Sequence, residues 1–178
     1  MQTHHGFIHV ESALECGSTF QLYFPILNTS VKNNDSHTSL DSSTSSGTET
    51  ILIVEDEELL IGMVHFLLEA KGYKVFLAHD GIEAVALYKA HSHEIDLVLS
   101  DMGLPGMSGT EVLKKIRQIN PEVKVMLSSG FIDPDIKLEL FEAGAKGFIQ
   151  KPYSPDEILR KLREVLDKKK EENDRSNF

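Results

Sequence analysis

The sequence predicts an α/β fold in which a five-stranded parallel sheet carries helices on both faces. Between residues 50 and 168, short apolar runs alternate five times with segments of helical periodicity. This alternation is typical of parallel sheets, because parallel neighbours need a long crossover connection and a helix supplies it. The expected strands comprise residues 51–54, 74–78, 95–99, 123–127 and 147–150.

The expected helices follow these strands and have recognisable starts or ends. In the first helix, apolar residues recur at three- and four-residue spacing and mark one buried face, which comprises Leu60, Val64, Leu67 and Leu68. Gly72 ends this helix, and Pro121 prevents the third helix from continuing. In the last helix, Ser154 is the expected N-cap, Pro155 takes the first helical position and Glu157 completes a capping box. The helices between them are expected over residues 82–90, 110–119 and 134–143.

Residues 28–49 differ from the rest of the chain in composition. Eleven of these 22 residues are serine or threonine, and few are apolar. Such a stretch cannot bury enough apolar surface to offset its conformational entropy, so we expect a flexible linker. The linker separates an N-terminal piece, residues 1–27, from a domain over residues 50–168. A charged tail, residues 169–178, follows the domain and is expected to fray.

Two strand-like runs precede the linker, at residues 7–11 and 19–24. In the second run apolar and polar residues alternate, as in a strand with one buried face. The region resembles the Gly-x-Gly-Thr/Ser-x-Phe motif before the final strand of histidine-kinase ATPase domains, at Gly17, Ser18, Phe20 and Pro25. Glu15 stands in place of the motif's first glycine. The resemblance implies that residues 1–27 are the terminal fragment of such a domain, and the alternative is an unrelated β-hairpin arm.

The amino-acid composition restricts the binding partners and the cellular compartment that we expect for this protein. The chain has 28 acidic and 18 basic residues and a net charge of −10, so we expect no nucleic-acid partner and consider cation binding. Its one cysteine, Cys16, excludes an internal disulfide and fits a reducing compartment. No apolar run approaches the roughly 20 residues of a membrane span. We therefore expect a cytoplasmic protein, or a soluble piece of a larger one, without direct membrane contact.

Four of the five expected strands lead into polar side chains that can bind ions or phosphate. Because the carboxyl ends of parallel strands meet at one edge of a sheet, we expect these side chains to lie close together. The first strand is followed by Glu55 and Asp56, the third by Asp101, the fourth by Ser128 and Ser129, and the fifth by Lys151.

This set of residues suits phosphoryl chemistry. Carboxylates at close range repel one another unless a cation lies between them, and oxygen ligands beside a phosphoryl group favour Mg²⁺. Asp101 can itself accept a phosphoryl group as a nucleophile. Lys151 would neutralise the transferred group, and a serine hydroxyl would donate a hydrogen bond to one of its oxygens. The turn-rich loop after Asp101 would let the carbonyl of Gly103 face the metal.

Residues 50–168 resemble the receiver domain of response regulators in four motifs, ILIVEDEE, LVLSDMGLPGMSG, VMLSSG and FIQKP. The resemblance implies a flavodoxin-like, doubly wound sheet with strand order 2-1-3-4-5 and helices on both faces. It also implies a cis bond between Lys151 and Pro152. It assigns the phosphoacceptor to Asp101 and Mg²⁺ binding to Glu55, Asp56, Asp101 and Gly103.

The resemblance also assigns a conformational switch. Counted back from Lys151, the family spacing places the switch hydroxyl on Ser129, with Ser128 as the alternative. Ser129 and Lys151 join Asp101 as the expected catalytic residues. Phe148 occupies the position of the switch aromatic, and we expect its ring to turn inward even without phosphate, because burial of a phenyl ring is favourable.

The function implied by the resemblance is that of a phosphoacceptor in a two-component phosphorelay. A phosphohistidine on a histidine kinase or a histidine phosphotransfer protein would donate its phosphoryl group to Asp101, and phosphorylation would switch a protein–protein surface. The N-terminal resemblance adds an origin in a hybrid sensor histidine kinase. The kinase's phosphorylatable-histidine helix and ATP-binding boxes are missing, so we expect no kinase or ATPase activity beyond phosphorylation of Asp101 from a donor. A homodimer is compatible with this function.

Two other functions are compared with this one. An aspartyl-phosphate hydrolase of the haloacid-dehalogenase type would carry a second aspartate two residues after the nucleophile, where this chain has Gly103. A docking module that is never phosphorylated would not need the whole set of Glu55, Asp56, Asp101, Ser129 and Lys151. Asp101 alone could be a turn former, because aspartate readily bonds its own loop backbone. The joint presence of the four motifs favours the receiver.

Overall fold

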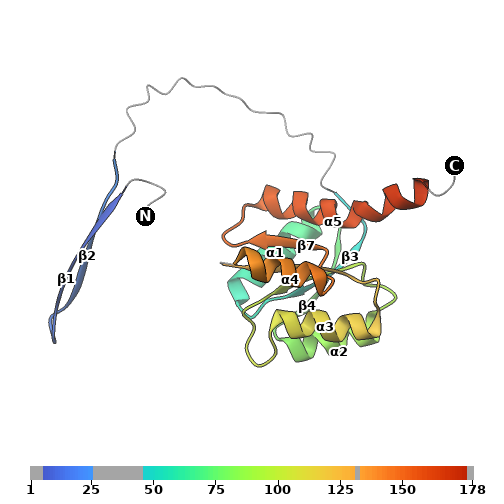
Figure 1. Ribbon diagram of the computed structural model, residues 1–178, viewed down its shortest axis with the longest axis horizontal. Helices are drawn as coiled ribbons and strands as arrows, with labels where there is room; N and C mark the ends of the chain where they lie inside the picture. Colours follow the sequence, from blue (N-terminus) through green and yellow to red (C-terminus); the bar gives the residue numbers. More distant parts are fainter. Residues whose placement is uncertain (1–5, 26–45, 131–132, 176–178) are drawn as a thin grey trace, which may run out of the picture. The chain divides into compact units, whose positions relative to one another are not determined.

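The computed structural model describes residues 6–25, 46–130 and 133–175 of the chain (Figure 1). The chain divides into two compact units, one up to Leu40 and one from Asp41 onward, and each is described here by itself. Most of the predicted linker, residues 28–45, lies outside the described residues, so its flexibility stays a prediction. In the described part of the chain, no helix combines the length and the apolar character that crossing a membrane requires.

The first unit contains an antiparallel hairpin of β1 (Phe7–Ala13) and β2 (Gly17–Tyr23). The turn between them includes Glu15 at a φ of 61°, and Gly17, the first residue of β2, has a φ of 87°. Every residue of both strands is exposed. The expectation that the second strand has one buried face is therefore wrong for the described hairpin, because two strands alone offer no layer on which an apolar face can pack.

The second unit is built on a parallel sheet with the order β4-β3-β5-β6-β7. Counted within this unit the order is 2-1-3-4-5, as predicted from the resemblance. The strands are β3 (Thr50–Val54), β4 (Lys74–Ala78), β5 (Leu97–Asp101), β6 (Lys124–Ser129) and β7 (Gly147–Gln150).

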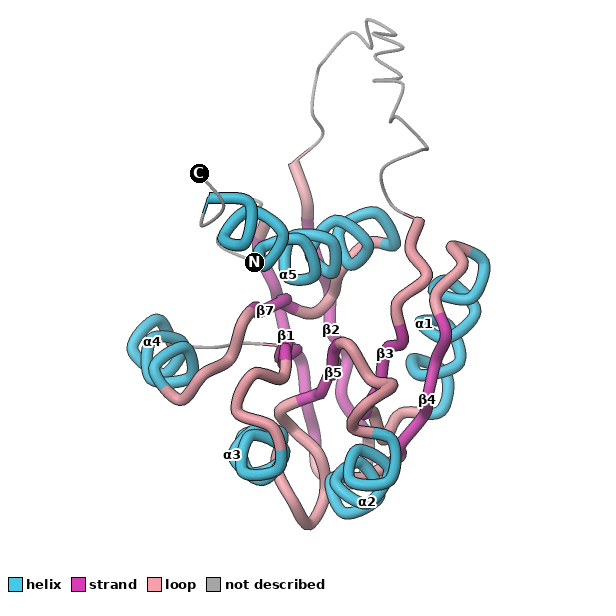
Figure 2. Tube along the Cα trace, turned by 90° about the vertical axis from the view of Figure 1, so that its right-hand side faces the viewer, coloured by secondary structure: helices cyan, strands magenta, loops and turns pink. Residues whose placement is uncertain are grey.

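Helices cover both faces of this sheet, which confirms the doubly wound fold (Figure 2). The core on one face includes side chains of α1 and α5, and the core on the other includes side chains of α2, α3 and α4. The helices are α1 (Glu58–Ala70), α2 (Gly81–His91), α3 (Gly109–Ile119), α4 (Pro134–Glu142) and α5 (Pro155–Arg175).

The buried face of α1 is rotated slightly from the predicted one. Its fully buried side chains are those of Ile61, Val64 and Leu68. Leu60 and Leu67, which the sequence pattern also placed on the buried face, are only partly buried at the border of the core. A helix face that packs on a sheet is wide, so the apolar periodicity fixes its direction only approximately.

Strand β5 begins and ends two residues later than predicted. Ile95 is buried but precedes the strand, and the ladder with β3 starts at Leu97. Asp101 is therefore the last residue of the strand, where it pairs in register with Ser128 of β6. The later end matters for the site, because the backbone of Asp101 is fixed by the sheet and not by the loop.

Helix α5 begins where the capping pattern predicts. The Glu157 backbone N–H donates to the Ser154 hydroxyl at 3.2 Å. The backbone is helical to Arg175, and the fraying of residues 169–178 stays a prediction. Lysine and glutamate are frequent in the last turns, and both are good helix formers.

The last residues of the predicted linker, 46–49, belong to the second unit and contact its helices. The Gly47 N–H donates to the Lys71 carbonyl at 3.1 Å. The Arg163 guanidinium donates to Glu49 at 2.8 Å and to the Tyr73 hydroxyl at 3.3 Å. A Cβ on Gly47 would lie 2.4 Å from the Tyr73 ring, so only glycine fits there. The chain is therefore held on this unit before β3 begins.

We predict that Ile116→Ala destabilises the chain by about 2–5 kcal/mol, because Ile116 is fully buried and its truncation leaves a cavity between α3 and the sheet. Ile119→Ala, on the same helix at 40% exposure, should cost less than about 1 kcal/mol. Urea denaturation of the two variants measures both values. Equal losses would contradict the packing described for α3.

Candidate functional site

Lys151 joins two carboxylates at the carboxyl edge of the sheet. Its Nζ lies 2.7 Å from Glu55 Oε2 and 3.0 Å from Asp101 Oδ1. The two acidic side chains are almost buried, with exposed fractions of 6% for Glu55 and 12% for Asp101. Three residues from three separate strand ends therefore form one ion-paired group.

Backbone hydrogen bonds place these side chains. The Glu55 N–H donates to the Ala78 carbonyl at 3.1 Å, which continues the pairing of β3 and β4. The Lys151 N–H donates to the Ser129 carbonyl at 2.8 Å, which continues the pairing of β6 and β7. The bond between Lys151 and Pro152 is cis, as the resemblance implied.

Both carboxylate oxygens of Asp101 have further contacts. The Ser128 hydroxyl donates to Oδ1 at 3.3 Å, and the Gly103 N–H donates to Oδ2 at 3.1 Å. The expected contribution of Gly103 was its carbonyl oxygen, whereas the contact seen here is made by its N–H. The carboxylate of Asp101 is therefore oriented by the strand beside it, by its own loop and by Lys151.

A glycine that sequence reasoning missed lets α3 start close to Asp101. A Cβ on Gly109 would lie 2.1 Å from the Asp101 carbonyl oxygen, so any larger residue would displace the loop or the helix. Ser108 caps α3 in a capping box with Glu111. The Ser-Gly pair at the end of the turn-rich loop is the sequence signal that could have indicated this close approach.

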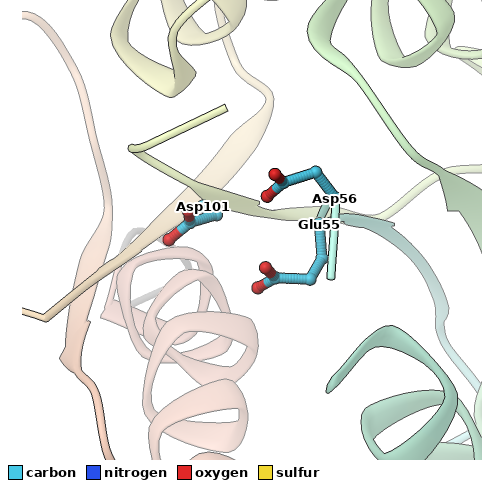
Figure 3. Close-up of side chains that lie close together, drawn as sticks. All are labelled: Glu55, Asp56 and Asp101. Atoms are coloured by element: carbon cyan, nitrogen blue, oxygen red, sulfur yellow. The ribbon is translucent and has the colours of Figure 1, made fainter. Parts of the chain in front are cut away.

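Glu55, Asp56 and Asp101 form an acidic cluster. Figure 3 shows their carboxylates gathered at one place, with Asp56 from the loop after β3. One oxygen of each lies within 4.8 Å of the others. Mg²⁺ holds oxygens at about 2.0–2.1 Å, so ligands on opposite sides of the ion are roughly 4 Å apart. Small side-chain movements would therefore fit these carboxylates around a hard divalent cation.

Burial and ion pairing set the charge state of the site. Burial raises the pKa of the Glu55 carboxyl, and the hydrogen bond from Lys151 offsets only part of this effect. Burial also opposes the charge on Lys151, but its hydrogen bonds to Glu55 and Asp101 outweigh the burial, so the pKa of Lys151 is raised. Lys151 is thus a cation at neutral pH and can neutralise an anionic group bound at Asp101.

The two serines at the end of β6, Ser128 and Ser129, lie on opposite faces of the sheet. Successive side chains of a strand point to opposite faces, so Ser128 lies on the face of Met126 and Ser129 on the face of Leu127. Ser128, the alternative in the sequence prediction, is buried and contacts Asp101. Ser129 is partly exposed at the end of β6.

The expected switch aromatic lies on the same face as Ser129. Phe148 pairs in register with Leu127, and its ring is partly buried against the core beneath α2, α3 and α4. The Lys137 Nζ lies 5.4 Å from the centre of the ring. The partial burial excludes a wholly exposed ring, while the switching role of Phe148 stays a prediction.

Tyr153 is a second residue near the site that sequence reasoning did not find. It is partly buried beside α1, and burial raises its pKa to about 12. It lines a pocket of about 410 Å³ together with Lys151 and with Leu60 and Met63 of α1. The site therefore opens on its α1 side toward an apolar wall.

Comparisons with known proteins agree with this geometry. The sequence matches the family described as the response regulator receiver domain over residues 51–163. It is 31% identical over 170 residues to the sensor kinase CckA of Brucella abortus, which covers 92% of this chain but only 18% of the kinase. It is 35% identical over 117 residues to the chemotaxis protein CheY of Bacillus subtilis, covering 65% of this chain and 96% of that protein.

A solved structure shares the fold of the second unit. A chain of the CheX–CheY–BeF3–Mg²⁺ complex from Borrelia burgdorferi is 29% identical, with a TM-score of 0.64, and the match covers 66% of this chain and 88% of that one. The family match spans β3 to α5 and contains the whole site around Asp101. The chain therefore belongs to the response regulator receiver domain family and has its CheY-like, flavodoxin-like fold.

Proposed function

We propose that this chain is a phosphoacceptor receiver domain in which Asp101 accepts a phosphoryl group from a phosphohistidine, with Mg²⁺ at the acidic cluster. Receiver domains generally bind Mg²⁺ and interact with histidine kinases or phosphotransfer proteins. The observation that carries the proposal is the position of Asp101, whose carboxylate lies 3.0 Å from the Lys151 ammonium and beside Glu55 and Asp56.

The chemistry of the transfer needs one nucleophilic oxygen on this chain. An oxygen of the Asp101 carboxylate forms a bond to phosphorus while the phosphorus–nitrogen bond of the donor breaks. The electron pair of that bond stays on the imidazole nitrogen, which takes up a proton from solvent. The product is an aspartyl phosphate and a free histidine on the donor.

Lys151 and a serine would stabilise the transferred group. Lys151 is already paired with Asp101 and remains charged, so its ammonium can shift to a phosphoryl oxygen. Ser128 contacts Asp101 from the same face of the sheet. Ser129 is the proposed switch hydroxyl, because it lies on the face of Phe148 and could couple the phosphoryl group to that ring.

Asp56, Asp101 and the Gly103 carbonyl would hold Mg²⁺, with Glu55 acting mainly through water. The pairing of Glu55 with Lys151 at 2.7 Å supports an indirect role for this carboxylate. When bound, Mg²⁺ would neutralise charge on the phosphoryl oxygens. The Borrelia complex to which the chain is similar contains Mg²⁺ and BeF3, an anion that resembles a phosphoryl group in shape.

The proposed parent protein is a hybrid sensor histidine kinase with this receiver near its end. The match to the Brucella sensor kinase covers 92% of the chain, so it must include part of the segment before β3. Glu15 supports the same origin, because it has the positive φ that favours glycine and stands where the ATPase motif has its first glycine. Residues 1–27 would then be the terminal hairpin of the ATPase domain.

We predict that wild-type protein gains the mass of one phosphoryl group when it is treated with acetyl phosphate and Mg²⁺, and that Asp101→Asn gains none. The amide of the variant is not a nucleophile. Among the described residues, Lys151 pairs with two carboxylates, those of Glu55 and Asp101, so the variant keeps only Glu55 beside this lysine. Intact mass spectrometry measures the change. Asp156→Asn, at an exposed position of α5, is the matched control and should be labelled like wild type.

Two other results would refute this assignment. Stoichiometric labelling of Asp101→Asn would place the phosphoacceptor elsewhere. Release of phosphate without accumulation of the labelled protein would favour an aspartyl-phosphate hydrolase, and no labelling at all would favour a docking module.

We predict that Asp56→Asn weakens Mg²⁺ binding by at least about tenfold, because it removes one charged ligand from the cluster. Isothermal titration with MgCl2 gives the dissociation constants. Glu58→Gln removes the same charge two residues away, at a side chain that is 81% exposed, and should leave the affinity within about twofold. Equal affinities of Asp56→Asn and wild type would show that the ligand set is wrong.

A further inference from the structure

An apolar pocket adjoins the ion-paired group of Lys151 on its α1 side. It has a volume of about 410 Å³, which is enough for a small ligand. We call it the α1 pocket, and its lining residues are Leu60, Met63, Gly130, Lys151, Pro152 and Tyr153. Lys151 is therefore shared between this pocket and the proposed phosphoacceptor, since its Nζ lies 3.0 Å from Asp101 Oδ1.

The α1 pocket has one charged end and an uncharged wall. Among its described lining residues, Lys151 alone is charged at neutral pH, because burial raises the pKa of the Tyr153 hydroxyl to about 12. Leu60 and Met63 lie one helical turn apart on α1 and form the apolar side of the pocket. An anionic group would therefore bind at the Lys151 end, while the rest of the ligand would contact an apolar surface.

The chemistry at Asp101 restricts the ligand further, and this step rests on the proposed function. An aspartyl phosphate is a mixed anhydride of a carboxylic acid and phosphoric acid. The phosphorus–oxygen bond of a phosphate ester, such as a sugar phosphate or a nucleoside monophosphate, is too stable to drive its formation. Another acyl phosphate can drive it, because the bond that breaks is of the same type as the bond that forms.

We infer that the α1 pocket binds the aliphatic chain of a small acyl phosphate whose phosphoryl group lies between Lys151 and Asp101. An oxygen of Asp101 forms a bond to phosphorus while the bond between phosphorus and the acyl oxygen breaks. The electron pair of that bond stays on the acyl oxygen, so the acid leaves as a carboxylate and needs no proton. Donors with a longer aliphatic chain then react faster than acetyl phosphate, whose methyl group covers little of the wall at Leu60 and Met63.

The area that the chain buries sets the size of this preference. Removal of one methylene group from water is worth about a factor of four in affinity. Butyryl phosphate has two methylene groups more than acetyl phosphate, and Met63 is 49% exposed, so we expect a preference of about fivefold to fifteenfold. Binding of the chain is equally strong before and during the transfer, so the gain appears in the second-order rate constant at low donor concentration.

The test compares acetyl phosphate with butyryl phosphate on the full chain, at equal low concentrations and with Mg²⁺ present. Acetic and butyric acid are nearly equal in strength, so the two donors have similar intrinsic reactivity. Intact mass spectrometry at several reaction times gives a second-order rate constant of phosphorylation for each donor. We expect the constant for butyryl phosphate to be at least about fivefold larger than that for acetyl phosphate.

Two variants of α1 locate the effect. Met63→Gln keeps the size of the side chain but makes the wall polar, so it should lower the ratio of the two rate constants at least about threefold. Leu59→Gln is the matched control, because Leu59 is 83% exposed on the same helix and is not among the residues that line the α1 pocket. Its ratio should stay within about twofold of the wild-type ratio. Circular dichroism checks the fold, and Met63→Ala replaces Met63→Gln if that variant unfolds.

Three results would overturn the inference. These are equal rate constants for the two donors, a wild-type ratio in the Met63 variant, and an equal loss of the ratio in both variants. In each of these cases, labelling by acetyl phosphate would leave the proposed phosphoacceptor role of Asp101 intact. No labelling by either donor would refute that role and the inference together.

Discussion

The ammonium group of Lys151 lies between two buried carboxylates, and the rest of the site depends on this arrangement. Its contacts with Glu55 and Asp101, at 2.7 and 3.0 Å, connect the ends of β3, β5 and β7. A buried carboxylate without a cationic partner is costly, so Lys151 stabilises the charged form of both acids. In the proposed function, the same ammonium neutralises the phosphoryl group on Asp101.

Because side chains alternate along each strand, the residues that contact Asp101 and the proposed switch residues lie on opposite faces of the sheet. Asp101, Ser128 and Lys151 lie together on the face of α1 and α5, where their contacts are direct. Ser129 and Phe148 lie on the face of α2, α3 and α4. The two groups meet at the end of β6, where Ser128 and Ser129 are adjacent, and at the end of β7, where Phe148 lies three residues before Lys151.

Much of the second unit could be predicted from sequence, because its strands are short apolar runs and its helices have clear caps. The end of β5 could not, since Ser100 and Asp101 are polar and only their pairing with the neighbouring strands includes them in the sheet. Close approaches at Gly47 and Gly109 depend on tertiary contacts that local patterns do not encode. The contact between Ser128 and Asp101 was likewise beyond a spacing argument, which gives sequence distance and not the face of the strand.

Chemical trapping of the phosphorylated residue tests the central claim most directly. Sodium borohydride reduces an aspartyl phosphate to homoserine with release of phosphate, and it leaves free carboxylates and phosphate esters unchanged. After treatment with a phosphodonor and Mg²⁺, followed by borohydride and peptide mass spectrometry, we expect homoserine at position 101 alone. Homoserine at another aspartate, or none despite a gain of phosphoryl mass, would contradict the assignment of Asp101 as the phosphoacceptor.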